Sequence, residues 1–592
     1  MQTSDKLLLL RNKMVELGID ACIIPSGDPH LSEYPSQHWK IREWLSSFTG
    51  SAGTLVVTAE EAGLWTDSRY FLQAEDELDT QSITLFKEGE KGVPQYTEWL
   101  CEVLMPGSRV AVNGATVSVS LLRKITRELR KEQIQIDSSV TLAEDVWEAR
   151  PPIPDNTVII HDDKWSGQSR AEKLEMLRRE MKRDGVTHYI TAALDEIAWL
   201  LNLRGTDVPY NPVFHAFLMV EFGTVKLFIN PHKLTAQIAR KLDGDDIRVS
   251  LYENFEAHLK EIPDDASVLL DPDRINSSIY ASIPPKCTKR EQTSYITSLK
   301  ARKNDTEIAN LKKTLINDGL AMVHFLKWLE DKVGEGEITE MSAAETLKSF
   351  RAAQPEFVGE SFRTISGYAE HGAIVHYSVS NETNRKLKPE GLYLVDSGGQ
   401  YKGGTTDITR TVALGKFPKQ AKTDYTLVLK GHIALACAVF PQGTRGVHLD
   451  ILAREALWRH GLNYGHGTGH GIGFFLNVHE GPQSIRPQDN GIEIEPGMVS
   501  SNEPGVYRRG EYGIRIENLI LAKVKQESEF GTFMEFETLT LCPIDKTLID
   551  KSLLTQQECE WFNNYHAGVY NALAPLLDED HKNWLKEKTS AL

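Results

Sequence analysis

An internal repeat in the first half of the chain limits the folds that it can adopt. A segment that starts at Lys6 recurs 167 residues later at Lys173, with the same order of apolar and charged residues. Both copies space their apolar residues as an amphipathic helix does, end that helix at a glycine (Gly18 and Gly185) and continue into a short apolar run. This order predicts a helix followed by a strand in each copy.

A second match shows where the two copies differ in length. Trp44-Leu45 recurs as Trp199-Leu200, 155 rather than 167 residues later, so the first copy carries 12 extra residues before Trp44. The proline-rich stretch 151–154 lies between the copies. We therefore predict two related α/β domains, at 1–152 and 153–297.

A different pattern begins near residue 298. Residues 303–330 have the apolar spacing of a long helix, short glycine-punctuated strands follow from 359 to 541, and helical spacing returns at 553–584. We predict a third domain at 298–592, of α+β type, that ends in a helical extension.

Composition narrows the class of protein. Of the 592 residues, 66 are Lys or Arg and 83 are Asp or Glu, which gives a net charge of −17 and argues against binding of nucleic acid or anionic membranes. The six cysteines lie far apart without a CxxC pair, which suits reduced thiols rather than disulfides or a thiolate zinc site. No run approaches the ~20 apolar residues that a membrane-spanning helix needs. These features predict a soluble cytoplasmic protein.

A predicted hairpin in the third domain carries a pair of aspartates. In 391–414, β-rich runs flank a glycine-rich turn. If the turn is centred between Tyr401 and Lys402, Asp396 and Asp407 face each other across the two strands.

A second predicted hairpin repeats this arrangement with glutamates. In 502–521, a turn centred on Gly510 places Glu503 opposite Glu517. Like charges directly opposite each other destabilise a sheet, so the acids lie either on a solvated face or around a cation. Two such pairs in glycine-rich, otherwise apolar strands favour the cation.

A glycine-rich segment with two histidines separates the hairpins. Residues 464–474 read YGHGTGHGIGF, which is too rich in glycine for a stable helix, so His466 and His470 do not form a helical zinc-binding pair. His479 follows nine residues later, and His376 ends an apolar run. A lone histidine is usually a structural residue, and the clustering of these histidines weakens that interpretation here.

Charge counting indicates how many cations the acids can hold. The four carboxylates carry a charge of −4, which two divalent cations balance, with His470 as the single nitrogen ligand. Such a ligand set suits Mn²⁺, with Co²⁺, Zn²⁺ or Fe²⁺ as alternatives. Two ions can acidify a bridging water molecule and polarise a carbonyl group.

These motifs resemble those of the pita-bread metallopeptidases, the family of methionine aminopeptidase, prolidase and aminopeptidase P. The resemblance implies five metal ligands, Asp396, Asp407, His470, Glu503 and Glu517, in the contexts VDSGG, TTDITRT, GTGHGIG, NEPG and RIEN. Two repeated domains ahead of the third resemble the large, three-domain cytosolic Xaa-Pro aminopeptidases. That likeness extends to IPSGDPHLSEY, FTGSAGT and LWTDSRYF in the first domain.

The resemblance also implies a fold and a reaction. The fold is two N-terminal α/β domains of the creatinase type followed by a pita-bread catalytic domain. The reaction is hydrolysis of the peptide bond between an N-terminal residue and a following proline, through a hydroxide that bridges two metal ions. The ions implied are Mn²⁺, or alternatively Zn²⁺ or Co²⁺. The partners implied are peptides with an N-terminal Xaa-Pro sequence and a second copy of the chain in a homodimer.

Residue roles follow from the same matches. Glu503 is implied to be both a ligand and the proton shuttle to the leaving proline nitrogen. His376, His466 and His479 match histidines that bind substrate and stabilise the tetrahedral intermediate. Arg515, in RIEN, is implied to hydrogen-bond a ligand carboxylate.

Arg69 allows two interpretations. In the motif WTDSRYF of the first domain, it matches a position that reaches the substrate across a dimer. The alternative is a surface arginine beside Asp67. The sequence leaves both interpretations open.

Two other functions fit parts of the sequence. A prolidase has the same metal centre but cleaves only Xaa-Pro dipeptides, and the duplicated N-terminal domain favours the aminopeptidase because prolidases usually have one such domain. A non-catalytic pita-bread domain that only binds peptides lacks the metal ligands, whereas this chain keeps all five. The preference for proline rests on the resemblance alone.

Overall fold

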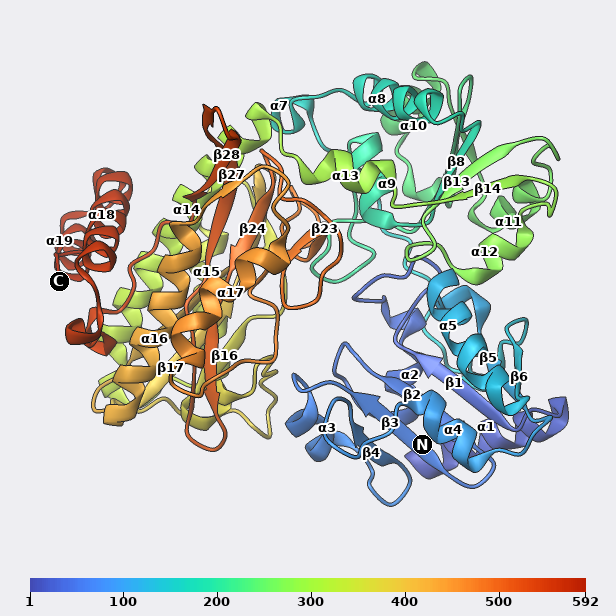
Figure 1. The fold of residues 1–592 in the computed structure, drawn as a ribbon, viewed down its shortest axis with the longest axis horizontal. Coiled ribbons are helices and arrows are strands. Elements are labelled where there is room, and N and C mark those ends of the chain that lie inside the picture. Colours follow the sequence, from blue (N-terminus) through green and yellow to red (C-terminus); the bar gives the residue numbers. More distant parts are fainter. The chain divides into compact units, whose positions relative to one another are not determined.

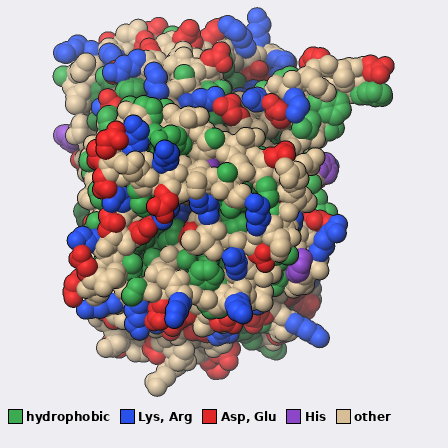
Figure 2. All heavy atoms as spheres, turned by 90° about the vertical axis from the view of Figure 1, so that its left-hand side faces the viewer, with side chains coloured by type: hydrophobic (Ala, Val, Ile, Leu, Met, Phe, Trp, Pro, Cys, Tyr) green, Lys and Arg blue, Asp and Glu red, His purple; other side chains and the backbone are tan.

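The computed structural model describes all 592 residues, which fall into two compact units. One unit consists of Met1–His161 and Gln168–Thr297, and the other of Asp162–Gly167 and Ser298–Leu592. Figure 1 shows the elements of each unit along the chain. On the face shown in Figure 2, basic and acidic side chains are interspersed, so this face has no large patch of one sign. None of the helices has both the length and the apolar character that crossing a lipid bilayer requires.

The N-terminal unit contains two six-stranded sheets with matching strand order, β4-β3-β2-β1-β5-β6 and β12-β11-β10-β8-β13-β14. In the first sheet, β2 pairs with β1 and with β3 in antiparallel fashion; in the second, β10 pairs in the same way with β8 and with β11. All other neighbouring strands in both sheets are parallel. The strands of the first sheet are β1 (Ala21–Pro25), β2 (Thr54–Thr58), β3 (Ala62–Thr66), β4 (Thr84–Lys87), β5 (Arg109–Val112) and β6 (Gln135–Asp137). Those of the second are β8 (His188–Thr191), β10 (Phe217–Glu221), β11 (Val225–Phe228), β12 (Ile247–Ser250), β13 (Ser267–Leu270) and β14 (Thr288–Glu291), and β7 (Ile159–Ile160) pairs separately with β9 (Leu203–Arg204). The predicted pair of related α/β domains is confirmed, while their predicted limits stay a prediction.

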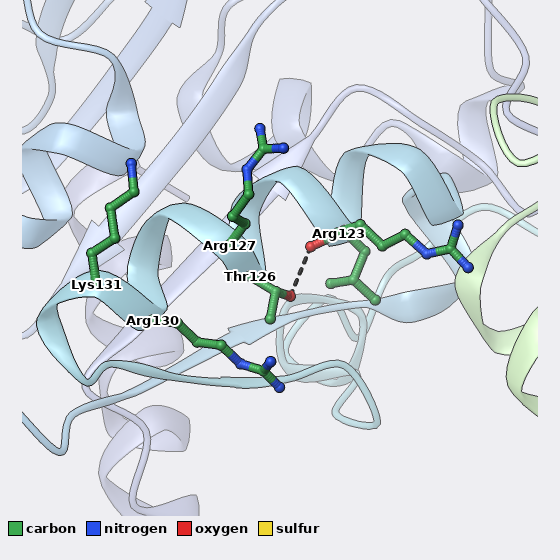
Figure 3. A pocket seen from close by; sticks show the side chains of 6 residues that line it. Arg123, Thr126, Arg127, Arg130 and Lys131 are labelled. Atoms are coloured by element: carbon green, nitrogen blue, oxygen red, sulfur yellow. Dashed lines mark hydrogen bonds between the residues drawn. The ribbon is translucent and has the colours of Figure 1, made fainter.

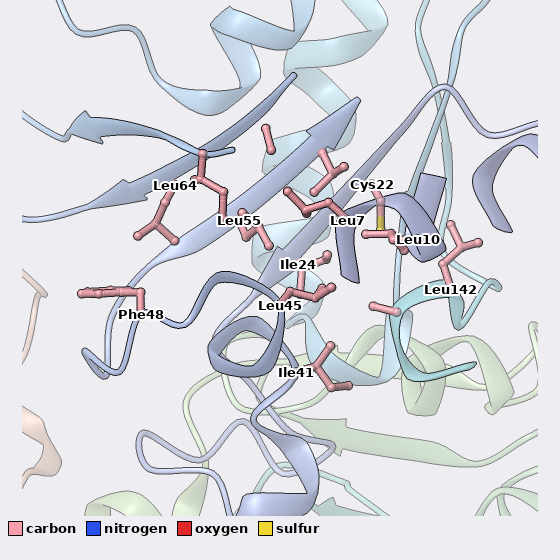
Figure 4. Packing of buried hydrophobic residues seen from close by; sticks show 14 of the residues in the cluster. Leu7, Leu10, Cys22, Ile24, Ile41, Leu45, Phe48, Leu55, Leu64 and Leu142 are labelled. Atoms are coloured by element: carbon pink, nitrogen blue, oxygen red, sulfur yellow. The ribbon is translucent and has the colours of Figure 1, made fainter. Parts of the chain in front are cut away.

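Helices cover both faces of the first sheet because side chains alternate along its strands. From β1, Cys22 and Ile24 pack with Leu7 of α1 on one face (Figure 4), whereas Ala21 and Ile23 pack into the cluster on the other face. The first face carries α1 (Thr3–Leu17), α2 (Ile41–Ser46), α3 (Phe71–Glu77) and α6 (Leu142–Asp145); the second carries α4 (Tyr96–Val103) and α5 (Val119–Leu129).

The repeated sequence signals fall on corresponding helices. α1 ends at Gly18 with φ 63°, and α8 (Arg170–Arg183) is followed by Gly185 with φ 65°, a left-handed conformation that favours glycine. Trp44 lies in α2 and Trp199 in α9 (Leu194–Leu201), so the second match also joins equivalent elements. The remaining helices before the third domain are α10 (Ala236–Gly244), α11 (Phe255–Leu259), α12 (Ser277–Ser282) and α13 (Tyr295–Ala301).

The longest helix of the C-terminal unit is the predicted one, α14 (Asp305–Lys332). Asn304 caps it by accepting hydrogen bonds from two first-turn amides. The other helices are α7 (Asp163–Ser166), α15 (Glu340–Ala352), α16 (Lys419–Ala436), α17 (Gly446–Trp458), α18 (Gln556–Leu573) and α19 (Glu579–Lys588). The last two helices confirm the predicted helical tail.

Two main sheets of the C-terminal unit lie under pairs of helices. α16 and α17 pack on the sheet β21-β28-β27-β24-β22-β23, and α14 and α15 pack on the sheet β16-β17-β20. Two smaller sheets are β15-β18-β19 and β25-β26. The strands are β15 (Phe357–Glu360), β16 (Ile365–Tyr368), β17 (Leu392–Ser397), β18 (Gly399–Tyr401), β19 (Gly404–Thr405), β20 (Ile408–Ala413), β21 (Val439–Pro441), β22 (Gly469–Gly471), β23 (Glu480–Ile485), β24 (Val499–Asn502), β25 (Gly505–Arg508), β26 (Tyr512–Arg515), β27 (Asn518–Ser528) and β28 (Gly531–Thr538).

The predicted register of the first acidic hairpin is wrong by two residues. Asp396 stands opposite Thr409, not opposite Asp407. The turn falls at Lys402 and Gly403, because Tyr401 is fully buried in β18 and its hydroxyl donates to a buried aspartate. A residue held in this way cannot lie in an exposed turn.

The predicted register of the second hairpin is confirmed. Gly505 pairs with Arg515, and Asn502 pairs with Asn518, on either side of the two glutamates. The turn contains Gly510 at φ 75°, a conformation that a residue with a Cβ rarely adopts.

Candidate metal centre

The five predicted ligands come from the strands and connections of the C-terminal unit. Asp396 lies in β17, Asp407 between β19 and β20, His470 in β22, Glu503 between β24 and β25, and Glu517 between β26 and β27. Asp396, Asp407 and Glu517 are buried, whereas the other two are partly exposed. The site is therefore assembled from both main sheets and both hairpins.

Asp407, His470 and Glu517 form a compact group. Ligand atoms from all three lie within 4.8 Å of one another, and Nε2 of His470 is 3.4 Å from Oδ2 of Asp407. The same nitrogen is 3.7 Å from Oε1 of Glu503. Carboxylate oxygens and an imidazole nitrogen gathered in this way can converge on a divalent cation.

Local backbone contacts orient the ring of His470. Nδ1 lies 3.0 Å from the carbonyl oxygen of Gly471, which can only accept, so Nδ1 carries the hydrogen and donates it. Nε2 then presents its lone pair towards Asp407. This tautomer is the one that a metal ligand requires.

Arg515 holds Asp396 and contacts Glu517 indirectly. Its Nη2 donates to Oδ2 of Asp396 at 2.7 Å, and its Nε donates to Oγ1 of Thr409 at 3.0 Å. The hydroxyl of Thr409 donates to Oε2 of Glu517 at 2.7 Å. Oδ1 of Asp396 is buried without a hydrogen-bond partner, which costs free energy in the absence of a compensating contact. A cation fits at this oxygen.

Burial and mutual repulsion raise the pKa values of three carboxyl groups. Burial is the larger cause for Asp407, Glu503 and Glu517, and a neighbouring acid is the next cause in each case. Arg515 supplies one positive charge to this acidic group. The donor set therefore fits divalent cations, whose charge keeps the carboxylates ionised at neutral pH.

His466 and His479 lie against the ligands. Nδ1 of His466 is 3.8 Å from Oε2 of Glu503, and its Nε2 is 2.8 Å from the hydroxyl of Tyr507. The ring of His479 meets the ring of His470 edge to face, with centroids 4.4 Å apart at 82°. Both imidazoles are thus next to the acidic group.

His376 lies in the connection between β16 and β17. The preceding residue, Val375, presents its carbonyl oxygen 3.5 Å from Nη2 of Arg515. The loop that carries His376 therefore contacts the arginine that holds Asp396.

Two residues that the sequence reasoning missed connect these groups. Thr409 bridges Arg515 and Glu517, and Tyr507 accepts a hydrogen bond of 2.7 Å from Nη1 of Arg515 while contacting His466. The sequence could have indicated Thr409 and Tyr507 only through their places in the two predicted hairpins, where each lies on a strand close to a predicted ligand.

A buried ion triad directly follows His479. Glu480 binds Nζ of Lys300 and Nζ of Lys303, each at 2.7 Å, and all three side chains are almost fully buried. The triad fixes the start of β23, and hence the backbone that carries His479.

Arg69 lies in the N-terminal unit. Its guanidinium makes a two-point ion pair with Asp67, with Nε 2.8 Å from Oδ1 and Nη2 2.7 Å from Oδ2. This ion pair is compatible with the alternative interpretation, and the role of Arg69 in substrate binding stays a prediction.

The N-terminal unit also has a hollow of about 650 Å³ along α5 (Figure 3). The residues that line it are Leu122, Arg123, Thr126, Arg127, Arg130 and Lys131. Glu291 binds Arg123 through two hydrogen bonds. The hollow contains none of the predicted site residues.

Comparison with protein families matches nearly the whole chain. The model of metallopeptidase family M24 matches residues 309–523, and the C-terminal region of the M24 peptidases matches 532–592. Models of the creatinase/prolidase N-terminal domain match 6–144 and 149–307.

Individual proteins and structures give closer matches. The chain is 39% identical to aminopeptidase P2 of Arabidopsis thaliana, over 99% of this chain and 88% of that protein. It is 40% identical to a probable Xaa-Pro aminopeptidase P of Coprinopsis cinerea, over 100% and 98%. The crystal structure of X-prolyl aminopeptidase from Caenorhabditis elegans, described as a cytosolic enzyme with a di-nuclear active site, matches with a TM-score of 0.96 and 34% identity over 100% of both chains.

Fold, acidic site and family matches together define a metallopeptidase of the M24 type with two creatinase-like N-terminal domains. Within that class, the chain belongs to the aminopeptidase P family. The predicted fold class and the resemblance drawn from the sequence motifs are confirmed.

Proposed function

We propose that this protein is a metal-dependent aminopeptidase that hydrolyses the bond between an N-terminal residue and a following proline. The proposal rests on the convergence of ligand atoms from Asp407, His470 and Glu517. The carboxylates of Asp396 and Glu503 lie next to this group. Relatives named Xaa-Pro aminopeptidase P support the substrate class, and the di-nuclear site of the Caenorhabditis elegans enzyme supports a two-metal centre.

The five ligands would hold two divalent cations. When bound, such ions acidify a water molecule and polarise a carbonyl group. Four carboxylates and one imidazole form a largely hard donor set, for which we propose Mn²⁺, with Zn²⁺ or Co²⁺ as alternatives.

Protein side chains then orient the peptide and move the proton. Glu503 is partly exposed, and its Oε1 lies 3.7 Å from Nε2 of His470, so its carboxylate is suited to take a proton from water and give it to the proline nitrogen. His479 is proposed to donate to the oxygen of the scissile carbonyl as negative charge develops there. His466 and His376 are proposed to hold the peptide in place.

Proline at the second position suits such a site. An Xaa-Pro bond is a tertiary amide without an N–H, so a protease that reads the substrate through a backbone ladder loses a hydrogen bond. Histidines and bound metal ions that recognise the carbonyl group instead would avoid that loss.

We also propose that the protein acts in the cytoplasm as a homodimer in which Arg69 reaches the substrate of the partner subunit. The description of the Caenorhabditis elegans enzyme as cytosolic supports the location. The family resemblance of the WTDSRYF motif supports the role of Arg69.

Removal of single ligands tests the proposal. After repletion with divalent cations, wild-type protein is expected to release the first residue of an Arg-Pro-Pro peptide. Asp407→Ala and Glu503→Ala are expected to lose more than about 100-fold in kcat/KM. Loss of a residue that only hydrogen-bonds a metal ligand already costs roughly 10–100-fold in metal affinity or activity. Glu529→Ala, at an exposed acid, serves as the control. Near-wild-type turnover by either ligand variant would contradict the proposal.

A further inference from the structure

Two asparagines face each other beside the two glutamates of the site. Asn502 ends β24 just before Glu503, and Asn518 begins β27 just after Glu517. The two asparagines are register partners, and both are fully buried. Because they form the end of the β24–β27 ladder, their position sets where the chain leaves the sheet towards each glutamate.

A single side chain on α16, His432, contacts both asparagines. Its Nδ1 lies 3.1 Å from the carbonyl oxygen of Asn502, and its Nε2 lies 3.1 Å from Nδ2 of Asn518. The side-chain amide of Asn502 donates back to the carbonyl oxygen of His432 at 2.9 Å. A carbonyl oxygen only accepts and an amide nitrogen only donates, so the ring has its hydrogen on Nδ1 and accepts at Nε2.

Arg410 fixes Asn518 from the opposite side. Its Nη2 donates to Oδ1 of Asn518 at 2.8 Å, and its Nη1 donates to the carbonyl oxygen of Glu517 at 2.6 Å. Oδ1 of Asn518 therefore faces the guanidinium, and Nδ2 is left to donate to His432. Arg410, Asn518, His432 and Asn502 form one continuous hydrogen-bonded chain across the sheet.

The ring of His432 stays neutral in this environment. Burial is the larger cause and the charge of Arg410 the next, and together they lower the pKa of His432 to about 3. A protonated ring has no acceptor for Asn518, so the neutral state preserves both contacts at physiological pH.

We propose that His432 is a positioning residue that fixes the spacing of Glu503 and Glu517 and thereby strengthens the binding of divalent cations. The effect on cation binding rests on the proposed function, because it takes the two glutamates as metal ligands. The effect on their spacing concerns the backbone and holds in metal-free protein as well.

The experiment compares His432→Phe with a matched control, His566→Phe. His566 is also fully buried in the C-terminal unit, and its pKa is likewise lowered to about 3. It accepts a hydrogen bond of 3.0 Å from the amide of Ile544 instead of contacting either asparagine. Both variants therefore lose a buried imidazole, whereas only His432→Phe loses the contacts with the two asparagines.

The first readout is amide hydrogen exchange in chelated protein. The amide of Glu503 donates to the carbonyl oxygen of Thr468 at 2.8 Å, and that of Glu517 to the carbonyl oxygen of Thr409 at 3.2 Å. H432F is expected to speed exchange of these two amides by about tenfold, and H566F by less than about twofold. No change in H432F, or an equal change in H566F, would overturn the proposal.

The second readout is the affinity for Mn²⁺, measured by equilibrium dialysis. H432F is expected to bind about 10-fold more weakly than wild type, and H566F within about twofold of it. Equal affinities for H432F and wild type would overturn the link to cation binding. Absence of any binding by wild type would contradict the proposed function instead, and the exchange readout would still decide the positioning role.

Asn518→Ala removes the contact between His432 and Asn518 by changing the other residue of the pair, and it replaces H432F in the experiment if H432F does not fold. It is expected to speed exchange of the amides of Glu503 and Glu517, as H432F does. Exchange rates equal to those of wild type would overturn the proposal.

Discussion

Arg515 donates a hydrogen bond of 2.7 Å to Asp396, and both side chains are buried. The same guanidinium binds Thr409, which in turn donates to Glu517. One positive charge therefore lies between an acid of the first hairpin and an acid of the second. This arrangement links the two hairpins and orients carboxylates for the proposed cations.

Replacement of Arg515 by lysine tests this link. Lysine keeps the charge but loses the planar fork that contacts Asp396, Thr409 and Tyr507. We expect R515K to bind Mn²⁺ roughly 10–100-fold more weakly, with a matching fall in kcat/KM. Calorimetric titration of chelated protein measures the affinity.

Arg508→Lys is the matched control for that experiment. Arg508 is also an arginine of the second hairpin and also binds one aspartate, Asp424, at two points, but it contacts none of the predicted ligands. Equal losses of cation affinity in R508K and R515K would contradict the role of Arg515.

Stability of metal-free protein should depend on pH in a defined direction. Asp407, Glu503 and Glu517 have folded-state pKa values raised above their usual values of about 4. Their contribution to stability is fully present below the unfolded pKa and is lost as pH rises through the folded pKa. We expect the Tm of chelated protein to fall as pH rises above the usual carboxyl pKa of about 4, and divalent cations to restore it.

Differential scanning calorimetry at several pH values measures this dependence. Glu517→Gln removes one of the three titrating groups and is expected to reduce the fall in Tm. A Tm of chelated wild-type protein that rises over this pH range, or an unchanged slope in E517Q, would contradict the prediction.

The buried triad at Glu480 makes a separate prediction about stability. Glu480→Gln leaves Lys300 and Lys303 without their shared carboxylate, and breaking a buried ion pair costs about 3–5 kcal/mol. Glu495→Gln is the control, since its ion pair with Arg302 is about two-fifths exposed and is expected to contribute less than about 1 kcal/mol. Urea unfolding measures both, and similar losses in the two variants would count against a structural role for the triad.

Arg69 can be tested against its partner Asp67. If Arg69 reaches the substrate, R69A lowers kcat/KM by at least about 10-fold, the loss expected from a charge-assisted hydrogen bond. Asp67→Asn weakens the same ion pair but keeps Arg69, and it should retain near-wild-type kcat/KM. The ion pair is about one-third exposed, so neither variant should lose more than about 1 kcal/mol of stability. Equal effects of R69A and D67N on kcat/KM would favour the ion pair alone.

Local sequence signals predicted much of the fold. The duplicated domain was visible because Gly18 and Gly185 end equivalent helices in a left-handed conformation. The second hairpin had the predicted register because Gly510 marks its turn. The first hairpin was predicted wrongly because Tyr401 is held in the sheet by Asp318, 83 residues earlier in the chain. A pattern read over twenty residues cannot contain such a contact.

The site shows the same limit. All five proposed ligands were recognisable as motifs, but the residues that support them were not. His432 lies in an ordinary helical sequence, and the residues that it contacts, Asn502 and Asn518, follow 70 and 86 positions later. Thr409 and Tyr507 likewise gain their roles only when the two hairpins meet.

The central proposal, metal-dependent removal of a residue that precedes proline, can be tested by mass analysis of the products of three short peptides. An Arg-Pro-Pro peptide, an Arg-Ala-Pro peptide and an Arg-Pro dipeptide are incubated with chelated protein and with protein reconstituted with Mn²⁺. The proposal predicts no cleavage by chelated protein, and loss of only the first arginine from Arg-Pro-Pro after reconstitution, faster than from Arg-Ala-Pro. Cleavage by chelated protein, equal cleavage of Arg-Ala-Pro, or cleavage of the Arg-Pro dipeptide alone would contradict it.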